Sequence, residues 1–208
     1  MRKLSPSLAG AICAAGAALF NAAGVVPLKD VPGAYKPDTV VLWLESLRAA
    51  PGPSELSAAL FVAGVLLLVP TAAVLARRLD APAPAAALAA GAVLNAAGAL
   101  LPIVVTRYVP DGADAVGQAF LGTAIALDAA FNACLGAAML GFGVAARRAG
   151  ASAYGWAGIV AGLATLPVAG QIVSRGAADW LGVAGPLWLT WLLWTAVRIA
   201  RSGVASRA

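Results

Sequence analysis

The sequence contains no histidine and only two cysteines. The absence of histidine excludes haem ligation by imidazole, histidine proton relays, most zinc sites and Ser-His hydrolysis. Cys13 and Cys134 lie far apart in the chain, inside apolar segments and outside any CxxC motif. We interpret both as packing residues rather than redox groups. These residue types predict no cofactor and no metal ion.

Charged residues are also scarce. They make up 11% of the 208 residues, against 62% hydrophobic residues, which is the composition of a membrane protein. Fourteen Lys and Arg against nine Asp and Glu give a net charge of +5. The basic residues lie in short stretches between apolar runs, where they indicate topology, so we expect membrane lipids and no nucleic acid as partners. The oligomeric state stays open.

Long apolar runs are abundant. A helix needs about 20 apolar residues to cross the hydrocarbon core of a bilayer. The sequence therefore predicts an all-α, polytopic membrane protein with one domain over residues 1–208. Its six transmembrane helices are expected at about 8–28, 56–76, 84–106, 116–146, 155–174 and 179–199.

The basic residues predict which side of the membrane each connection faces. One set of connections holds nine of them: Arg2, Lys3, Arg77, Arg78, Arg147, Arg148, Arg198, Arg201 and Arg207. The other set holds five: Lys29, Lys36, Arg48, Arg107 and Arg175. Because cytoplasmic loops carry the excess of Lys and Arg, both termini are expected in the cytoplasm.

The connection over residues 29–55 is the only long one on the predicted outer side. Within it, "DTVVLWLESLRA" (38–49) predicts a short external helix that Asp38 would cap. The helix could lie on the membrane interface or fold over the bundle. It could be a lid over a pocket or a solvated loop with an apolar patch.

A motif occurs twice, as "AAGAALFNAAGVVP" (14–27) and as "AAGAVLNAAGALLP" (89–102). Both copies lie in helices expected to run outward, which suggests helix-pair units in parallel orientation. Small residues along these helices, with Gly136 and the pair Gly158 and Gly162, predict close helix packing.

Four Asp and Asn residues lie deep inside the predicted spans. Asp128 and Asn132 are four residues apart and share a helix face, Asn95 has a similar depth, and Asn21 lies somewhat further out. Polar groups are costly against lipid, so these four should face inward and meet. Asp128 has no cation at its depth, so we expect it to be uncharged and bonded to an Asn or a carbonyl.

Two interpretations of these residues compete. In the first, Asp128 and the three asparagines are interhelical glue. In the second, Asp128 takes part in chemistry or proton coupling, because an Asn would have bonded without the cost of a charge. Trp188 and Trp191 in the last helix are either lipid-facing or packing aromatics, or they line a cavity whose ligand is cationic.

Two stretches resemble a broad group of small six-helix bacterial membrane proteins of unknown function. They are "FNACLGAAMLGFGVAARRAGASAYGWAGIVAGL" (131–163) and "GPLWLTWLLWTAVRIAR" (185–201), and the similarity covers mainly residues 131–201. The resemblance implies a six-helix fold and a bacterial cytoplasmic membrane. It supplies no catalytic residues.

The function predicted first is an intramembrane pocket for an apolar, lipid- or isoprenoid-like molecule. The protein could then be an acid-catalysed isomerase or cyclase in which Asp128 protonates an olefin or epoxide. Asn21, Asn95, Asn132, Trp188 and Trp191 would bind the substrate. A small proton-coupled transporter using Asp128 is the alternative, and a structural or accessory membrane subunit is the second alternative.

Overall fold

The computed structural model describes residues 6–205, and all regular elements in this range are helices. Six of its helical stretches are long and apolar enough to cross a membrane, as the sequence predicted. They are α1 (Pro6–Leu28), α3 with α4 (Pro51–Leu66 and Leu68–Leu79), α5 (Pro82–Tyr108), α6 (Asp114–Arg148), α7 with the 3-10 helix η2 (Ser152–Thr165 and Leu166–Ile172), and α8 with α9 (Arg175–Asp179 and Leu181–Ala205). The chain is therefore a multi-pass, all-helical membrane protein.

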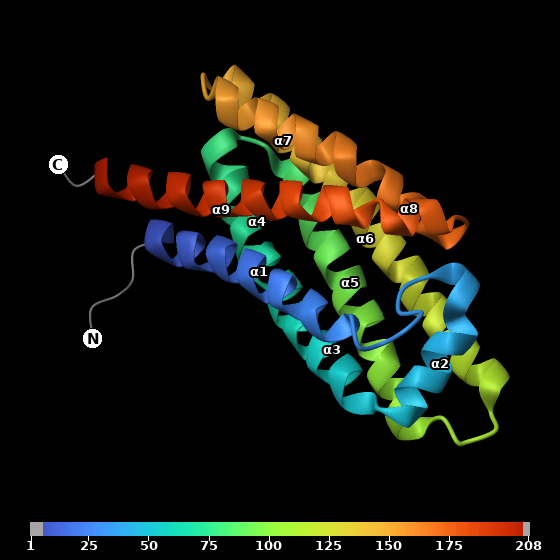
Figure 1. Ribbon diagram of the computed structural model, residues 1–208. Helices are drawn as coiled ribbons and strands as arrows, with labels where there is room; N and C mark the ends of the chain where they lie inside the picture. The colour runs from blue at the N-terminus through green and yellow to red at the C-terminus, as the bar shows by residue number, and fades with distance from the viewer. Residues whose placement is uncertain (1–5, 206–208) are drawn as a thin grey trace, which may run out of the picture.

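The six stretches form a ring in which successive spans are neighbours. α1 packs on α3, α3 on α5, α5 on α6 and α6 on α7, and α9 closes the ring against both α7 and α1. Figure 1 shows that α1 begins and α9 ends at one end of the bundle, while α2 and α8 lie toward the other end. Packing is local along the chain except where α9 joins α1.

Three spans are interrupted, and the sixth breaks at Trp180 between α8 and α9. The second breaks at Leu67 between α3 and α4. The fifth changes from an α-helix to the 3-10 helix η2 at Leu166, next to Pro167, which has no N–H for the α-helical ladder. The sequence predicted one uninterrupted helix over residues 155–174. The change redirects the last turn of this span, which bears on the site described below.

Glycines allow the closest approaches between spans, because hydrophobic burial does not drive association within lipid and backbone contact replaces it. A Cβ at Gly162 would lie 2.7 Å from the carbonyl oxygen of Gly136, and one at Gly143 would lie 2.6 Å from that of Gly155. A Cβ at Gly158 would meet the indole nitrogen of Trp191 at 2.9 Å. The close packing predicted for Gly136, Gly158 and Gly162 is confirmed.

The segment between α1 and α3 folds over the end of the bundle. It contains the 3-10 turn η1 (Pro37–Thr39) and helix α2 (Val40–Ala49). Trp43, Leu44 and Leu47 are buried in one cluster with Ile125 of α6 and other side chains of α5 and α6. Of the two placements left open for the external helix, the packing is that of a helix folded over the bundle.

Asp38 does not cap this helix, so that prediction was wrong. The N-cap of α2 is Thr39, and no side chain makes a cap hydrogen bond there. Asp38 lies in the preceding 3-10 turn, and its carboxylate pairs instead with Arg175 of α8 at 3.5 Å. The pairing replaces the local bond because the segment packs close to α8.

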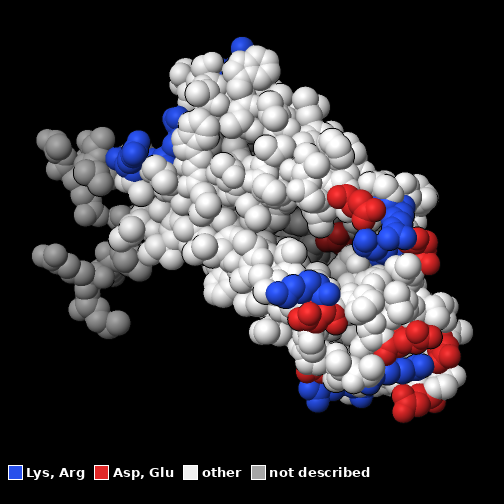
Figure 2. Space-filling model, viewed as in Figure 1, with Lys and Arg blue, Asp and Glu red and all other residues white. Residues whose placement is uncertain are grey.

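Charged side chains differ between the two ends of the bundle. At the end that carries α2 and α8 they form ion pairs, including Lys36 with Asp179 at 2.9 Å, Arg48 with Asp114 at 2.6 Å and Arg107 with Glu55 at 2.9 Å. Figure 2 shows mixed basic and acidic groups there. The opposite end carries a basic excess among the described residues: Arg77, Arg78, Arg147, Arg148, Arg198 and Arg201. Arg2, Lys3 and Arg207, which also entered the topology prediction, lie outside the described residues.

Candidate functional site

Asp128 lies near the middle of α6, about 21 Å along the helix from its start. Its oxygen Oδ1 accepts a hydrogen bond from Nδ2 of Asn95 on α5 at 2.7 Å. Its oxygen Oδ2 accepts one from Nδ2 of Asn132, one turn further along α6, at 3.1 Å. Bringing these three residues together agrees with the sequence-based expectation that polar groups at this depth meet.

A third amide completes the network. Nε2 of Gln171 donates to Oδ2 of Asp128 at 2.5 Å and approaches the carbonyl oxygen of Ile125 at 3.4 Å. Gln171 is 1% exposed and lies in η2. Gln171 was not among the site residues predicted from the sequence. Pro167 and Gly170 were the available signal, since together they indicate that the last turn of the fifth span departs from a regular α-helix.

In this network Asp128 acts only as a hydrogen-bond acceptor. Three N–H groups from α5, α6 and η2 point at its two oxygens, and an ionised carboxylate offers about four acceptor positions. No Lys or Arg among the described residues forms an ion pair with it. An ionised Asp128 would therefore be stabilised by these neutral dipoles, without a counter-charge from the described residues.

Tyr35, in the segment between α1 and α3 (residues 29–50, called the external segment), lies close enough to Asp128 to feel its charge. Its ring lies 4.8 Å from that of Trp43 and 6.5 Å from that of Phe61 on α3. Burial raises the pKa of the Tyr35 phenol, and the nearby Asp128 carboxylate raises this pKa further. Tyr35 has φ +57, a left-handed conformation that is unusual for a bulky residue. The backbone of the segment between α1 and α3 thus adopts an uncommon conformation at Tyr35.

The site is partly open rather than sealed. Asp128 is of intermediate exposure, while Asn95 and Asn132 are buried. Figure 2 shows a hollow beside paired charges, with acidic atoms recessed in it. Two surface hollows of about 440 and 470 Å³ lie elsewhere, one against Val116 and Phe120 of α6 and one between Pro84 and Arg148. Neither of these has Asp128 in its wall.

Asn21 does not join the network. Its Nδ2 donates to the carbonyl oxygen of Ala17 on its own helix at 2.8 Å. A Cβ at Gly64 of α3 would collide with this amide, so Asn21 fills the space that the glycine leaves. The two copies of the repeated motif thus place asparagines in different surroundings: Asn21 faces a glycine, and Asn95 faces Asp128.

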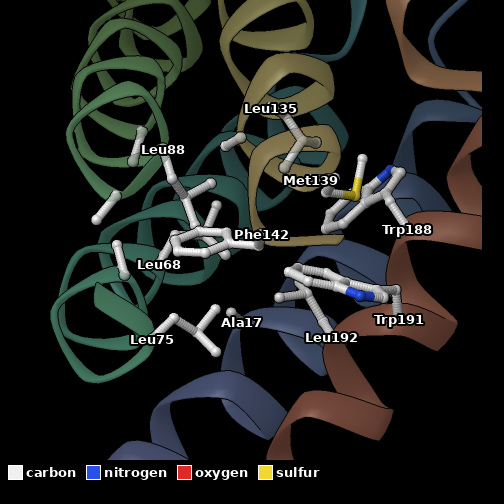
Figure 3. Close-up of a cluster of buried hydrophobic side chains, with 14 of the residues drawn as sticks. Ala17, Leu68, Leu75, Leu88, Leu135, Met139, Phe142, Trp188, Trp191 and Leu192 are labelled. Atoms are coloured by element: carbon white, nitrogen blue, oxygen red, sulfur yellow. The ribbon is translucent and has the colours of Figure 1, made fainter. Parts of the chain in front are cut away.

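Trp188 and Trp191 also lie away from Asp128. Both belong to the large buried cluster that includes Met139 and Phe142, and Figure 3 shows them there. The Trp191 ring stacks on Phe142 at 6.3 Å and on Tyr154 at 5.6 Å. Phe142 is 14 residues beyond Asp128 on α6, about 21 Å along the helix. These tryptophans are packing residues.

The comparisons with known proteins give no further guide. No family model matches the chain, no curated protein matches it and no solved structure matches it. The geometry around Asp128 is therefore the basis on which a function can be inferred.

Proposed function

We propose that the protein is a small membrane carrier that binds a ligand near Asp128 from the outer side and exchanges a proton on that carboxyl. One observation carries the proposal. The Asp128 carboxyl near mid-span accepts three amide N–H bonds from three elements, yet no cation of the described residues neutralises it. A charge at this depth costs at least about 2.5 kcal/mol, so proton uptake or a bound cation lowers its energy.

The amide ring suits a group that changes its protonation state. With the carboxyl ionised, Asn95, Asn132 and Gln171 all donate to it. With the carboxyl protonated, its new O–H needs an acceptor, and a turned amide group offers its oxygen. Neutral amides can serve both states, whereas a fixed Lys or Arg would favour the ionised state only.

The comparison of the two motif copies supports a role beyond packing. Asn21 and Asn95 follow the same local sequence and lie in α1 and α5, which pack on α3 and α6. In the contact between α1 and α3, Asn21 packs against Gly64 rather than against an acid. Because close packing around such an asparagine is achieved without a carboxyl, the presence of Asp128 in the contact between α5 and α6 calls for another explanation.

The charges at the two ends of the bundle orient this proposal. The basic end holds the α1 start and the α9 end, and we assign it to the cytoplasm by the positive-inside rule. The end with α2 and α8 then faces outward. In a bacterial cytoplasmic membrane, which the sequence resemblance implies, the site would open away from the cytoplasm beneath the external segment, with that segment acting as a lid.

An acid-catalysed enzyme acting on a lipid- or isoprenoid-like molecule would use the same carboxyl. Such an enzyme needs an O–H directed at its substrate and aromatic walls around the cation that forms. N–H donors already bond both oxygens of Asp128, and Trp188 and Trp191 lie in another cluster. The carrier therefore fits the described contacts better than the enzyme.

The proposal is tested by infrared spectroscopy of the protein in lipid vesicles while the pH of the bath is changed. A protonated carboxyl and a carboxylate absorb in separate bands. We expect a carboxyl band that appears and disappears reversibly in the wild type and is missing in Asp128→Asn. The matched control is Asp80→Asn, which removes an exposed acid at the end of α4.

The control should keep the Asp128 band. If wild type and Asp128→Asn give the same carboxyl spectra over the whole pH range, the acid does not exchange protons in the folded protein. The carrier proposal would then be wrong, and the structural-subunit interpretation would remain.

A further inference from the structure

We propose that the ligand of this site is a small amphipathic amine, whose ammonium group replaces the proton on Asp128 while its apolar part lies against Tyr35 and Trp43. The inference rests on the proposed function, because it assumes that Asp128 gives up its proton. It adds the chemical class of the ligand.

The acceptor positions of Asp128 provide the first argument. Three of about four positions on its oxygens accept amide N–H groups, so one remains for another donor. An ammonium N–H fits that position and brings the missing positive charge. An anionic ligand would be repelled by the carboxylate, and a neutral alcohol would leave the charge uncompensated.

The aromatic side chains provide the second argument. Tyr35 packs on Trp43, and Tyr35 also faces Phe61 edge to face. Trp43 shares a buried cluster with Ile125, which lies one turn before Asp128 on α6. Ring faces attract cations and apolar carbon alike, so this group suits a ligand that has both. The indole N–H of Trp43 has no partner among the described residues, so it is not committed to another contact.

Other charged groups near the site are already paired. At the outer end, Lys36 bonds Asp179 and Arg175 approaches Asp38. On the packed elements, α5 contributes Arg107, which is bonded to Glu55 of α3, and α2 contributes Arg48, which is bonded to Asp114. α1 has Cys13, the described part of α7 has Tyr154, and η2 has no ionisable residue. Within this set Asp128 is the acid available to an incoming cation, and Tyr35 is the titratable group beside it.

The test uses 2-phenylethylammonium as the probe and purified wild-type protein in weakly buffered detergent micelles. Binding is measured by calorimetry, and proton release is measured by a pH-sensitive dye. At a pH at which the Asp128 carboxyl is protonated, we expect one proton to be released per amine bound. Binding should weaken about tenfold for each further unit of acidity once the carboxyl is protonated, because proton and amine compete for one group.

Matched ligands and variants separate the parts of the site. The neutral analogue 2-phenylethanol should bind at least tenfold more weakly than the amine. Asp128→Asn should abolish binding, and Trp43→Leu should weaken it about tenfold or more. The control Trp156→Leu removes an exposed tryptophan of α7, far along the chain from Asp128, and should leave binding unchanged.

The outcomes distinguish the two proposals. Equal binding of amine and alcohol, pH-independent binding, or undiminished binding in folded Asp128→Asn would overturn the amine proposal. If the infrared band shows proton exchange at Asp128 and the probe does not bind, the amine proposal fails and the proposed function stands. If Asp128 exchanges no proton, both fail.

Discussion

Replacing Asp128 by Asn should stabilise the folded protein, although the acid lies at the centre of a hydrogen-bond network. An asparagine whose oxygen takes the place of Oδ2 keeps the bonds from Asn132 and Gln171. Its own amide group then faces Asn95, which can accept a bond after its amide turns by half a rotation. At most one of the three bonds is lost, at a cost of about 0.6 kcal/mol.

Asp128→Asn also removes an unpaired charge at mid-span, and this gain should exceed the small loss. That charge costs at least about 2.5 kcal/mol, so Asp128→Asn should raise the free energy of unfolding by about 2 kcal/mol. The assay is reversible unfolding in mixed micelles, followed by circular dichroism as the fraction of dodecyl sulfate rises, at mildly alkaline pH. A gain in stability at the cost of function is the pattern expected of a functional residue.

The matched control is Asp80→Asn. Asp80 is exposed and has φ 48, a conformation that Asn tolerates as well as Asp, so the change should stay within about 0.5 kcal/mol. A loss of 1 kcal/mol or more in Asp128→Asn would refute the reasoning. It would mean that the carboxylate contributes more to helix association than its burial costs, as the glue interpretation holds.

Three further predictions follow from the packing, the external segment and Tyr35. Gly162→Ala should lower the free energy of unfolding by about 1–3 kcal/mol, because its Cβ would press on a carbonyl of α6. Gly122→Ala, whose Cβ meets nothing within 4 Å, should be neutral or raise that free energy by up to about 1 kcal/mol. Equal effects of the two substitutions in micelle unfolding would contradict the close packing of α6 and α7 at Gly162. Lys36→Ala breaks an exposed ion pair with Asp179, so hydrogen exchange over residues 29–50 should become faster, and high salt should have the same effect on the wild type. Unchanged exchange in both experiments would show that the pair does not hold the segment. The Tyr35 phenol should ionise at higher pH than a free tyrosine, as measured by the difference in tyrosinate absorbance between the wild type and Tyr35→Phe, and folding stability should fall as the pH rises past 10.0 toward the raised pKa. Asp128→Asn should shift that ionisation to lower pH, and the absence of a shift would show that the two groups do not interact.

Much of the fold could be predicted because lipid imposes a simple rule on sequence. The long apolar runs of the sequence correspond to the six candidate spans, and the glycines of the fourth and fifth spans lie at helix contacts. The same rule brought Asp128 together with Asn95 and Asn132, since polar groups at one depth avoid lipid by meeting. Depth along a helix can be counted from the sequence, and for these three residues depth was sufficient.

What could not be predicted depends on rotation and on neighbours. Trp188 and Trp191 face a different cluster from Asp128, because apolar helices carry no polar face that would fix their rotation. Asn21 was grouped with the site because it is a polar residue inside a predicted span, but its surroundings are set by Gly64 on another helix. Gln171 and Tyr35 reach the site through a 3-10 turn and a left-handed residue, and neither conformation follows from hydrophobic periodicity.

The most direct test of the account asks whether position 128 can be reached from the outer side. In a chain with Cys13→Ala and Cys134→Ala, Asp128→Cys provides a single thiol, and Ala49→Cys at the exposed end of α2 provides the control. A small, membrane-impermeant thiosulfonate is added to the outside of sealed vesicles of known orientation. The account predicts that both thiols are modified, with position 128 slower. Modification of position 49 alone, or of position 128 only from the cytoplasmic side, would contradict it.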